Sequence, residues 1–387
     1  MKDRSERKPK MQKWKTMCGC MCGLWLALVG CQREPGQGYT LTGATVLIAA
    51  ADFAGANFLY SLELDLEGQF AGALNQTDLG ADPRLDPALP SKANCGGVWP
   101  FVVRREAWGA NLGSVAALRP GAGYPIDHVF QVNDGANPAN PQDIILLAPD
   151  RAYVSRFEPP YNDILVVNPQ TGAFLGNIDL SPLADQLPRP TRMLRWDGLV
   201  LVLLQDFSTG WPATFSNGKI AVIDPGSDTV ANVIALALVN PSGLALIPER
   251  NRLAVSAAGD WSDPDLTPAG VELVDLASQT SLGVVMTGAA VNGRITDVAG
   301  IGQGRAALIS YRADFSANDV FALELDSAQL SPALYTTAYA PDLEACGTAA
   351  LLVADATNSQ VVALDLDDLQ VMATLPLDTP PVAVSCW

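Results

Sequence analysis

The sequence predicts an all-β fold, a seven-bladed β-propeller of four-stranded blades. Three observations support this prediction. A short apolar run that ends on a polar residue recurs seven times at intervals of roughly 40 to 56 residues, the spacing typical of propellers. Almost no segment shows helical periodicity. The two ends of the chain carry complementary parts of one repeat, as described below.

Each repeat is expected to contribute strands a to d, from the axis outward. The recurring run is strand c, in the order LYSLE (59–63), VAALR (115–119), ILVVN (164–168), IAVID (220–224), VELVD (271–275), VFALE (320–324) and VVALD (361–365). Strand b precedes it, as VLIAAADF (46–53), FVVRREAW (101–108), AYVSRFE (152–158), LVLVLLQDF (199–207), RLAVSAAGDW (252–261), ALISYRADF (307–315) and LLVADAT (351–357). Turn residues and a further apolar run follow strand c, which indicates a hairpin to strand d. Runs such as PQDIILLAP, PTRMLRW, PSGLALIP and GRITDVAGI predict strand a.

The two ends of the chain are expected to close the ring. The first repeat begins with strand b at Val46 and lacks a strand a, whereas the chain finishes with PVAVSCW (381–387), a strand a without b, c and d. Pairing these segments removes the open sheet edges that favour aggregation. We therefore predict one propeller over residues 44–387.

The segment GKIAVIDPGSDTVANVIALALVNPSGLALIPERNRLAVS (218–256) carries a family resemblance. It resembles the YVTN-type repeat, which is found in surface-layer and lactonase-like seven-bladed propellers. This resemblance implies a seven-bladed propeller that works outside the cytoplasm, and it does not imply one activity.

The N-terminal region predicts export and a lipid anchor. A basic segment precedes the uncharged run TMCGCMCGLWLALVG (16–30), which has the organisation of a secretory signal peptide over residues 1–30. The run ends in LVGC, which resembles the bacterial lipobox. Cys31 is then the lipidated residue, followed by a polar linker over residues 31–43. The alternatives are a signal peptide that happens to contain a cysteine and a single-span anchor.

Charge and the residue after Cys31 restrict the partners and the compartment. The formal net charge is −17, and seven Lys/Arg against two acidic residues lie before residue 16. The remainder therefore carries about −22, which opposes binding to nucleic acid and a polybasic contact with anionic lipid. Gln32 favours the outer membrane, because an Asp at that position is linked to inner-membrane retention. We expect an envelope protein, peptide or glycan as partner, and a membrane contact through the anchor.

Three of the seven cysteines remain outside the signal peptide and the lipidation site. Cys95, Cys346 and Cys386 are each expected near the end of a strand a, in three consecutive blades around the closure. In an oxidising compartment one disulfide and one free thiol are expected. A disulfide from Cys386 would fasten the closing strand, and both Cys346 and Cys95 remain possible partners.

The sequence offers little for catalysis. The single histidine, His128, is expected in strand d of the second blade with a structural role. No catalytic triad signature, multi-histidine zinc motif or P-loop accompanies it. Asp260, Asp263 and Asp265 lie in an enlarged b–c loop and are candidate Ca²⁺ ligands, because Ca²⁺ takes six to eight oxygens. A solvated Asp/Pro turn is the favoured reading, so no cofactor is expected, with calcium as the alternative.

Recognition residues are expected on the face formed by the b–c and d–a loops. Aromatic residues at one mouth with an acidic rim are typical of recognition surfaces. The candidate ligand-binding residues are Trp108, Tyr161, Trp211, Trp261, Arg105, Arg156 and Arg312, although the arginines are first expected to pair with neighbouring carboxylates. In the Asp-Phe pairs at 52–53, 206–207 and 314–315, the Asp is expected to cap a turn and the Phe to pack between blades.

Two functional hypotheses follow, and a third, a purely structural surface-layer component, is not separated from the first by the sequence. The favoured one is a non-catalytic, lipid-anchored propeller that acts as a binding scaffold at the bacterial cell envelope. The alternative is an enzyme, a calcium-assisted hydrolase of the lactonase-like type. Three or more oxygen side chains converging at the channel mouth would favour the alternative.

Overall fold

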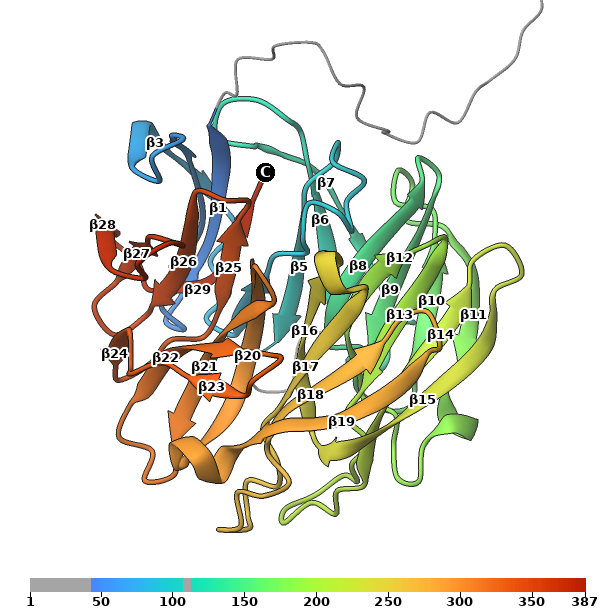
Figure 1. Cartoon of the computed structure of the whole chain (residues 1–387). Helices are drawn as coiled ribbons and strands as arrows, with labels where there is room; N and C mark the ends of the chain where they lie inside the picture. The colour runs from blue at the N-terminus through green and yellow to red at the C-terminus, as the bar shows by residue number, and fades with distance from the viewer. Residues whose placement is uncertain (1–42, 107–112) are drawn as a thin grey trace, which may run out of the picture. The chain divides into compact units, whose positions relative to one another are not determined.

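A computed structural model describes residues 43–106 and 113–387 of the chain. They form seven antiparallel sheets arranged in a ring, so the predicted seven-bladed propeller is confirmed (Figure 1). In each blade the strand nearest the axis is strand a. Within the described residues, no helix is long and apolar enough to cross a membrane.

The strands of the blades are as follows. Blade 1 contains β29 (Pro381–Cys386), β1 (Ala44–Ala51), β2 (Asn57–Leu64) and β3 (Phe70–Asp78). Blade 2 contains β4 (Leu85–Ala88), β5 (Phe101–Glu106), β6 (Ser114–Leu118) and β7 (Ile126–Gln131), and blade 3 contains β8 (Pro141–Ala148), β9 (Arg151–Arg156), β10 (Asp163–Val167) and β11 (Phe174–Asp179). Blade 4 contains β12 (Pro190–Trp196), β13 (Leu199–Leu204), β14 (Asn217–Asp224) and β15 (Thr229–Val239), and blade 5 contains β16 (Pro241–Ile247), β17 (Arg252–Ala257), β18 (Gly270–Asp275) and β19 (Thr280–Thr287).

The last two blades and three short 3₁₀ helices complete the described fold. Blade 6 contains β20 (Gly293–Gly302), β21 (Arg305–Arg312), β22 (Asn318–Glu324), β23 (Gln329–Leu330) and β24 (Tyr335–Thr337). Blade 7 contains β25 (Leu343–Cys346), β26 (Ala350–Asp355), β27 (Gln360–Leu364) and β28 (Val371–Pro376). The 3₁₀ helices are η1 (Ser181–Leu183), η2 (Pro248–Arg250) and η3 (Gly288–Val291).

The hydrophobic core lies between neighbouring blades. Strand β13 is buried on both faces, since one face packs against blade 3 and the other against blade 5. The outer strand β15 instead alternates exposed and buried residues along its C-terminal half, as expected for an edge strand with one solvent-exposed face. Each blade therefore depends on both neighbours for burial, which makes closure of the ring essential.

The ring closes as predicted. Strand β29 pairs antiparallel with β1, with Val46 opposite Cys386 and Ile48 opposite Val384. Beyond the strand, the Thr45 and Trp387 backbones exchange two hydrogen bonds of 2.7 Å. The last residues of the chain thus supply the strand that the first repeat lacks.

The outer strand of blade 6 differs from the prediction of one continuous strand d. It is split into β23 and β24, both of which pair with β22. Pro332 lies in the interruption, where it has no N–H to donate to the ladder. The neighbouring Ser331 and Leu334 amides still donate to β22 carbonyls, which holds the split strand in place.

Candidate functional site

A cavity opens at the axis on the face where the b–c and d–a loops gather. Its volume is ≈ 540 Å³, within the range of small-molecule sites. Blades 1, 2, 4, 6 and 7 all contribute to it, so residues far apart in the sequence meet there. The residues that line this mouth cavity are Phe53, Asp86, Ala88, Arg105, Arg192, Tyr339, Pro341, Asp342, Val382 and Ala383.

Two arginine–aspartate pairs form the polar part of the mouth cavity. Arg105 Nη2 lies 3.0 Å from Asp86 Oδ2, and its Nη1 donates to Gln142 Oε1 over 3.3 Å. Arg192 Nη2 donates to Asp342 Oδ1 over 3.2 Å. Within the described residues this is the one hydrogen bond of the Arg192 side chain, although a guanidinium carries five N–H donors. The cavity is therefore lined by donors that the protein itself does not use.

Two aromatic rings stand at the rim of the mouth cavity. Phe53 is 41% exposed and Tyr339 is 52% exposed. The Asp52 carboxylate accepts hydrogen bonds from the Ala54, Gly55 and Ala56 amides, which confirms the predicted turn cap. The prediction that Phe53 packs between blades is wrong. Its φ of 52° places it in the left-handed region, where the turn directs the ring outward.

Below the mouth cavity, three carboxylates join the inner strands of neighbouring blades. Asp143 accepts a hydrogen bond of 2.8 Å from the Met193 amide, which lies on the next blade. Asp297 and Asp342 accept corresponding bonds from the amides of Leu343 (3.3 Å) and Val384 (2.8 Å). Asp143 and Asp297 lie at register shifts of strands β8 and β20, where a bulge redirects a side chain.

These carboxylates, together with Glu344, surround the Arg192 guanidinium. Burial raises the pKa of Asp143 to about 6 and the pKa of Glu344 to about 8. Burial and the neighbouring Asp342 raise the pKa of Asp297 well above its usual range. Burial opposes the charge of Arg192, but the four carboxylates outweigh it and raise the pKa of the guanidinium. One cation thus faces four acids that share an enclosed space.

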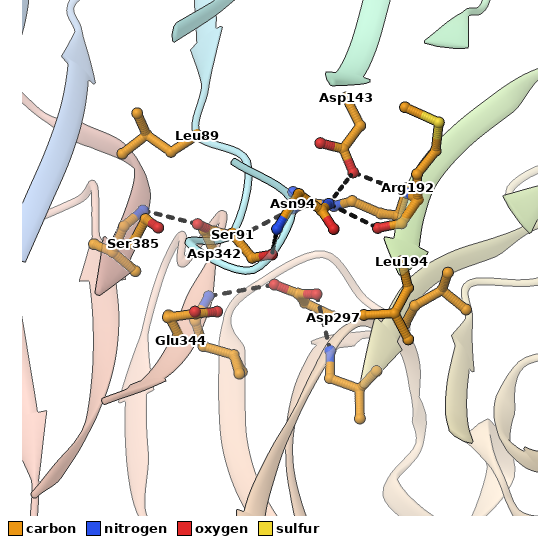
Figure 2. A pocket seen from close by; sticks show the side chains of 15 residues that line it. Leu89, Ser91, Asn94, Asp143, Arg192, Leu194, Asp297, Asp342, Glu344 and Ser385 are labelled. Atoms are coloured by element: carbon orange, nitrogen blue, oxygen red, sulfur yellow. Dashed lines mark hydrogen bonds and ion pairs between the residues drawn. The ribbon is translucent and has the colours of Figure 1, made fainter. Parts of the chain in front are cut away.

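The loop between β4 and β5 narrows the channel at the end away from the mouth cavity. Asn94 on this loop donates to Asp143 Oδ2 (3.2 Å) and to the Met193 carbonyl (2.9 Å), as Figure 2 shows for the Asp143 contact. Ser385 on blade 1 donates to the Pro90 carbonyl over 3.3 Å. A cavity of ≈ 90 Å³ remains between this loop and Arg192. The axial channel therefore narrows to this small cavity on the side away from the mouth cavity.

The three arginines proposed from the sequence all pair with carboxylates, as first expected. Arg105 lines the mouth cavity. Arg156 is buried and forms two hydrogen bonds of 2.7 and 2.6 Å with Asp163, while its guanidinium lies 4.0 Å from the centroid of the Tyr161 ring. Arg312 forms the same arrangement with Asp319, at 2.6 and 2.8 Å. Of the three, Arg105 alone is brought to the axis.

The three proposed tryptophans have different surroundings. Trp211 is 73% exposed. Trp261 stacks on Phe315 with ring centroids 6.2 Å apart, and the Arg294 guanidinium lies 5.2 Å from its centroid, so it belongs to an aromatic cluster across blades 5 and 6. Trp108 lies outside the described residues, as does the proposed lipidation site Cys31.

Phe315 has a φ of 59° and is 52% exposed, yet it stacks on Trp261 of the neighbouring blade 5, so the prediction of packing between blades is confirmed for one side of its ring. Phe207 packs against Phe157 and Phe215, with centroids 5.9 and 5.0 Å away. The Arg189 guanidinium lies over both Phe157 and Phe207. The Asp314 carboxylate accepts from the Ser316 amide and hydroxyl, which confirms its turn cap.

The candidate calcium ligands each accept hydrogen bonds within their own loop. Asp260 accepts from Ser262, Asp263 from the Asp265 amide, and Asp265 from Thr267. Across residues 43–106 and 113–387, no group of three or more His, Cys, Asp or Glu side chains is placed to hold a metal ion.

The cysteines near the closure adopt one of the two pairings left open. Cys346 on β25 and Cys386 on β29 form a disulfide, with their Cα atoms 5.4 Å apart, and Cys95 is a buried free thiol. The disulfide joins the inner strands of blades 7 and 1. It therefore fastens the closing strand to the blade that precedes it in the ring.

Sequence reasoning missed most of the mouth cavity, namely Arg192, Asp342 and Tyr339. One signal was available: Arg192 and Asp143 each stand two residues after a proline, in PTRMLRW and PQDIILLAP, and Asp342 directly follows Pro341. A charged residue at the start of an otherwise apolar inner strand indicates a side chain that faces the axis.

No protein-family model matches the chain, and no curated protein sequence matches it. Among solved structures, hydrazine synthase of Kuenenia stuttgartiensis is similar with a TM-score of 0.57 at 15% identity, over 78% of this chain and 90% of that one. A candidate 6-phosphogluconolactonase of Bacteroides fragilis has a TM-score of 0.56 at 12% identity, over 91% and 100%. AztD of Citrobacter koseri has a TM-score of 0.47 at 10% identity, over 90% and 98%, and carries no argument. At these identities the first two likenesses support the propeller fold alone.

Proposed function

We propose that this protein is a non-catalytic binding scaffold of the bacterial cell envelope that takes its ligand in the mouth cavity. The observation that carries this proposal is the cavity itself, with exposed Phe53 and Tyr339 at the rim and the under-used Arg192 guanidinium at the floor. A concave site with aromatic walls and a few convergent polar groups is the usual form of a ligand site.

The distribution of exposed aromatic residues supports the same face. Phe53, Trp211 and Phe315 lie on b–c loops, and Tyr339 lies on a d–a loop. Among the exposed large hydrophobic residues of the described chain, the one other aromatic is Phe174, which lies on the outer strand β11. Aromatic side chains anchor partners at recognition surfaces, so their accumulation on one face favours that face for binding.

The support for a lipid anchor and for the envelope compartment comes from the sequence. The basic segment, the apolar run and LVGC support export and acylation of Cys31, with the outer membrane favoured. Several acyl chains hold a protein far longer than one, at roughly 0.8 kcal/mol per buried CH₂. The YVTN-type resemblance agrees with a location outside the cytoplasm.

The test is capture of envelope components by the full-length, lipid-anchored protein in detergent. Tyr339→Ala removes an exposed ring from the mouth cavity, and Phe174→Ala removes an exposed ring from the outer strand β11 as the matched control. We expect a component that the wild type and Phe174→Ala retain and that Tyr339→Ala loses. Recovery of no consistent component, or equal retention by all three proteins, would refute binding at the mouth.

A further inference from the structure

We infer that the ligand of the mouth cavity is a neutral saccharide, bound through the end of its chain. This inference rests on the proposed function and names the ligand class for the same site. It draws on four features of the cavity: unused hydrogen-bond donors, exposed aromatic faces, a balanced local charge, and a narrow lower end.

The cavity holds more donors than acceptors. Asp342 already accepts from Arg192 and from the Val384 amide, and Asp86 is paired with Arg105. Arg192 donates one hydrogen bond within the described protein and is 30% exposed at its side chain. A ligand that fits must therefore present several oxygen acceptors close together. Sugar hydroxyls and ring oxygens do so, and the hydroxyls can also donate to the remaining carboxylate lone pairs.

The aromatic residues fit the apolar faces of a sugar ring. Phe53 and Tyr339 expose their rings at the rim of the same cavity. Val382, Ala383 and Pro341 add apolar surface without further polar groups. A saccharide is polar at its edge and carries C–H groups on its faces, so one ring can meet the arginine pairs and the aromatic residues together.

Charge argues against an ionic ligand. Each guanidinium in the cavity is matched by one carboxylate, Arg105 by Asp86 and Arg192 by Asp342. An anion would meet the paired carboxylates Asp86 and Asp342 as well as the formal net charge of −17 of the whole chain. A cation would meet the Arg105 and Arg192 guanidiniums in the cavity. A neutral ligand avoids both repulsions.

The narrow section of the channel restricts how a chain can bind. The loop that carries Asn94 lies across the axial channel below Arg192, through its bonds to Asp143 and Met193, and leaves a cavity of ≈ 90 Å³. This space is too small for a saccharide chain to thread through the ring. The site fits a disaccharide or the terminal sugars of a longer glycan.

The test is isothermal titration of the full-length protein, in a detergent without a sugar headgroup, with neutral disaccharides: cellobiose, maltose and N,N′-diacetylchitobiose. Glucuronic acid and trialanine serve as the charged and peptide comparators. We expect at least one neutral disaccharide to bind more tightly than both comparators. Tyr339→Ala should weaken that binding at least tenfold, while Phe174→Ala leaves it unchanged.

A second variant tests the polar contribution. Arg192→Met with Asp342→Asn removes the donor and its ion-pair partner together, and circular dichroism checks that the variant folds although Asp143, Asp297 and Glu344 lose the cation near them. Tenfold weaker binding by this folded variant supports the inference. Binding by none of the neutral disaccharides, tighter binding of glucuronic acid or trialanine, or no effect of Tyr339→Ala overturns it. If the saccharides fail while envelope capture still depends on Tyr339, the ligand class is wrong and the proposed function stands.

Discussion

Replacement of Glu344 by Gln should stabilise the protein increasingly as the pH rises. Burial, and then the charge of Asp342, raises the pKa of Glu344 from an ordinary 4.5 to about 8 in the folded protein. Between these values the folded chain holds a proton that the unfolded chain releases, so the contribution of Glu344 to stability is greatest below pH 4.5 and is lost as the pH rises to about 8. The full difference corresponds to roughly 5 kcal/mol at about 1.36 kcal/mol per pH unit. Relaxation and water in the cavity lower the effective field, so we expect about 2–3 kcal/mol.

Urea denaturation of the full-length protein at pH 5 and pH 9 measures this effect. The unfolding free energy of Glu344→Gln minus that of the wild type should increase by about 2–3 kcal/mol between the two pH values. Glu67→Gln, which removes an exposed carboxylate, is the control for the loss of one negative charge. A difference for Glu344→Gln that is the same at both pH values, or that falls with pH, would show that this carboxyl is not protonated in the folded state.

Three further predictions concern the closure and the ion pairs. Replacing Cys346 and Cys386 by Ser should lower the unfolding free energy by about 4 kcal/mol, because the disulfide closes a loop of 40 residues. Dithiothreitol should then destabilise the wild type and leave the variant unchanged in urea titrations. Arg156→Met should lower the unfolding free energy by about 3–5 kcal/mol because it leaves Asp163 buried without its cationic partner. Arg312→Met, at an exposed arginine, should lower it by less. Equal losses of stability for the Arg156→Met and Arg312→Met variants in thermal denaturation would contradict this reasoning. Removal of residues 381–387 should expose the edge of β1 and cause aggregation in size-exclusion chromatography; a monomeric, cooperatively unfolding product would be inconsistent with closure by β29.

The fold could be predicted in detail because its signals are local and repeated. Strand c recurs with one pattern, and each strand b precedes it at a short distance. The orphan segments at the two ends required a single long-range pairing, between Val46 and the C-terminal strand, and that pairing is confirmed. The split of strand d in blade 6 was missed, since the run between β22 and β25 contains no repeat-wide signal apart from Pro332.

The site could not be predicted to the same extent because it forms at the axis. Arg192 and Asp342 are 150 residues apart and meet only when blades 4 and 7 face each other across the channel. The exposed Phe53 was misplaced for another reason. The sequence indicates that a Phe follows strand b, but the direction of its ring depends on a left-handed turn residue, which the Asp-Phe pattern does not reveal.

The direction of strand β1 relates the start of the described propeller to the position of the mouth cavity. Strand β1 starts at Ala44, beside the C-terminal end of β29, and then runs toward the loop that carries Phe53. A tether that precedes Ala44 therefore joins the propeller at the end remote from the aromatic rim. The mouth cavity thus opens at the end of the ring opposite the start of strand β1, so a ligand can enter it without contacting the residues at which the described propeller begins.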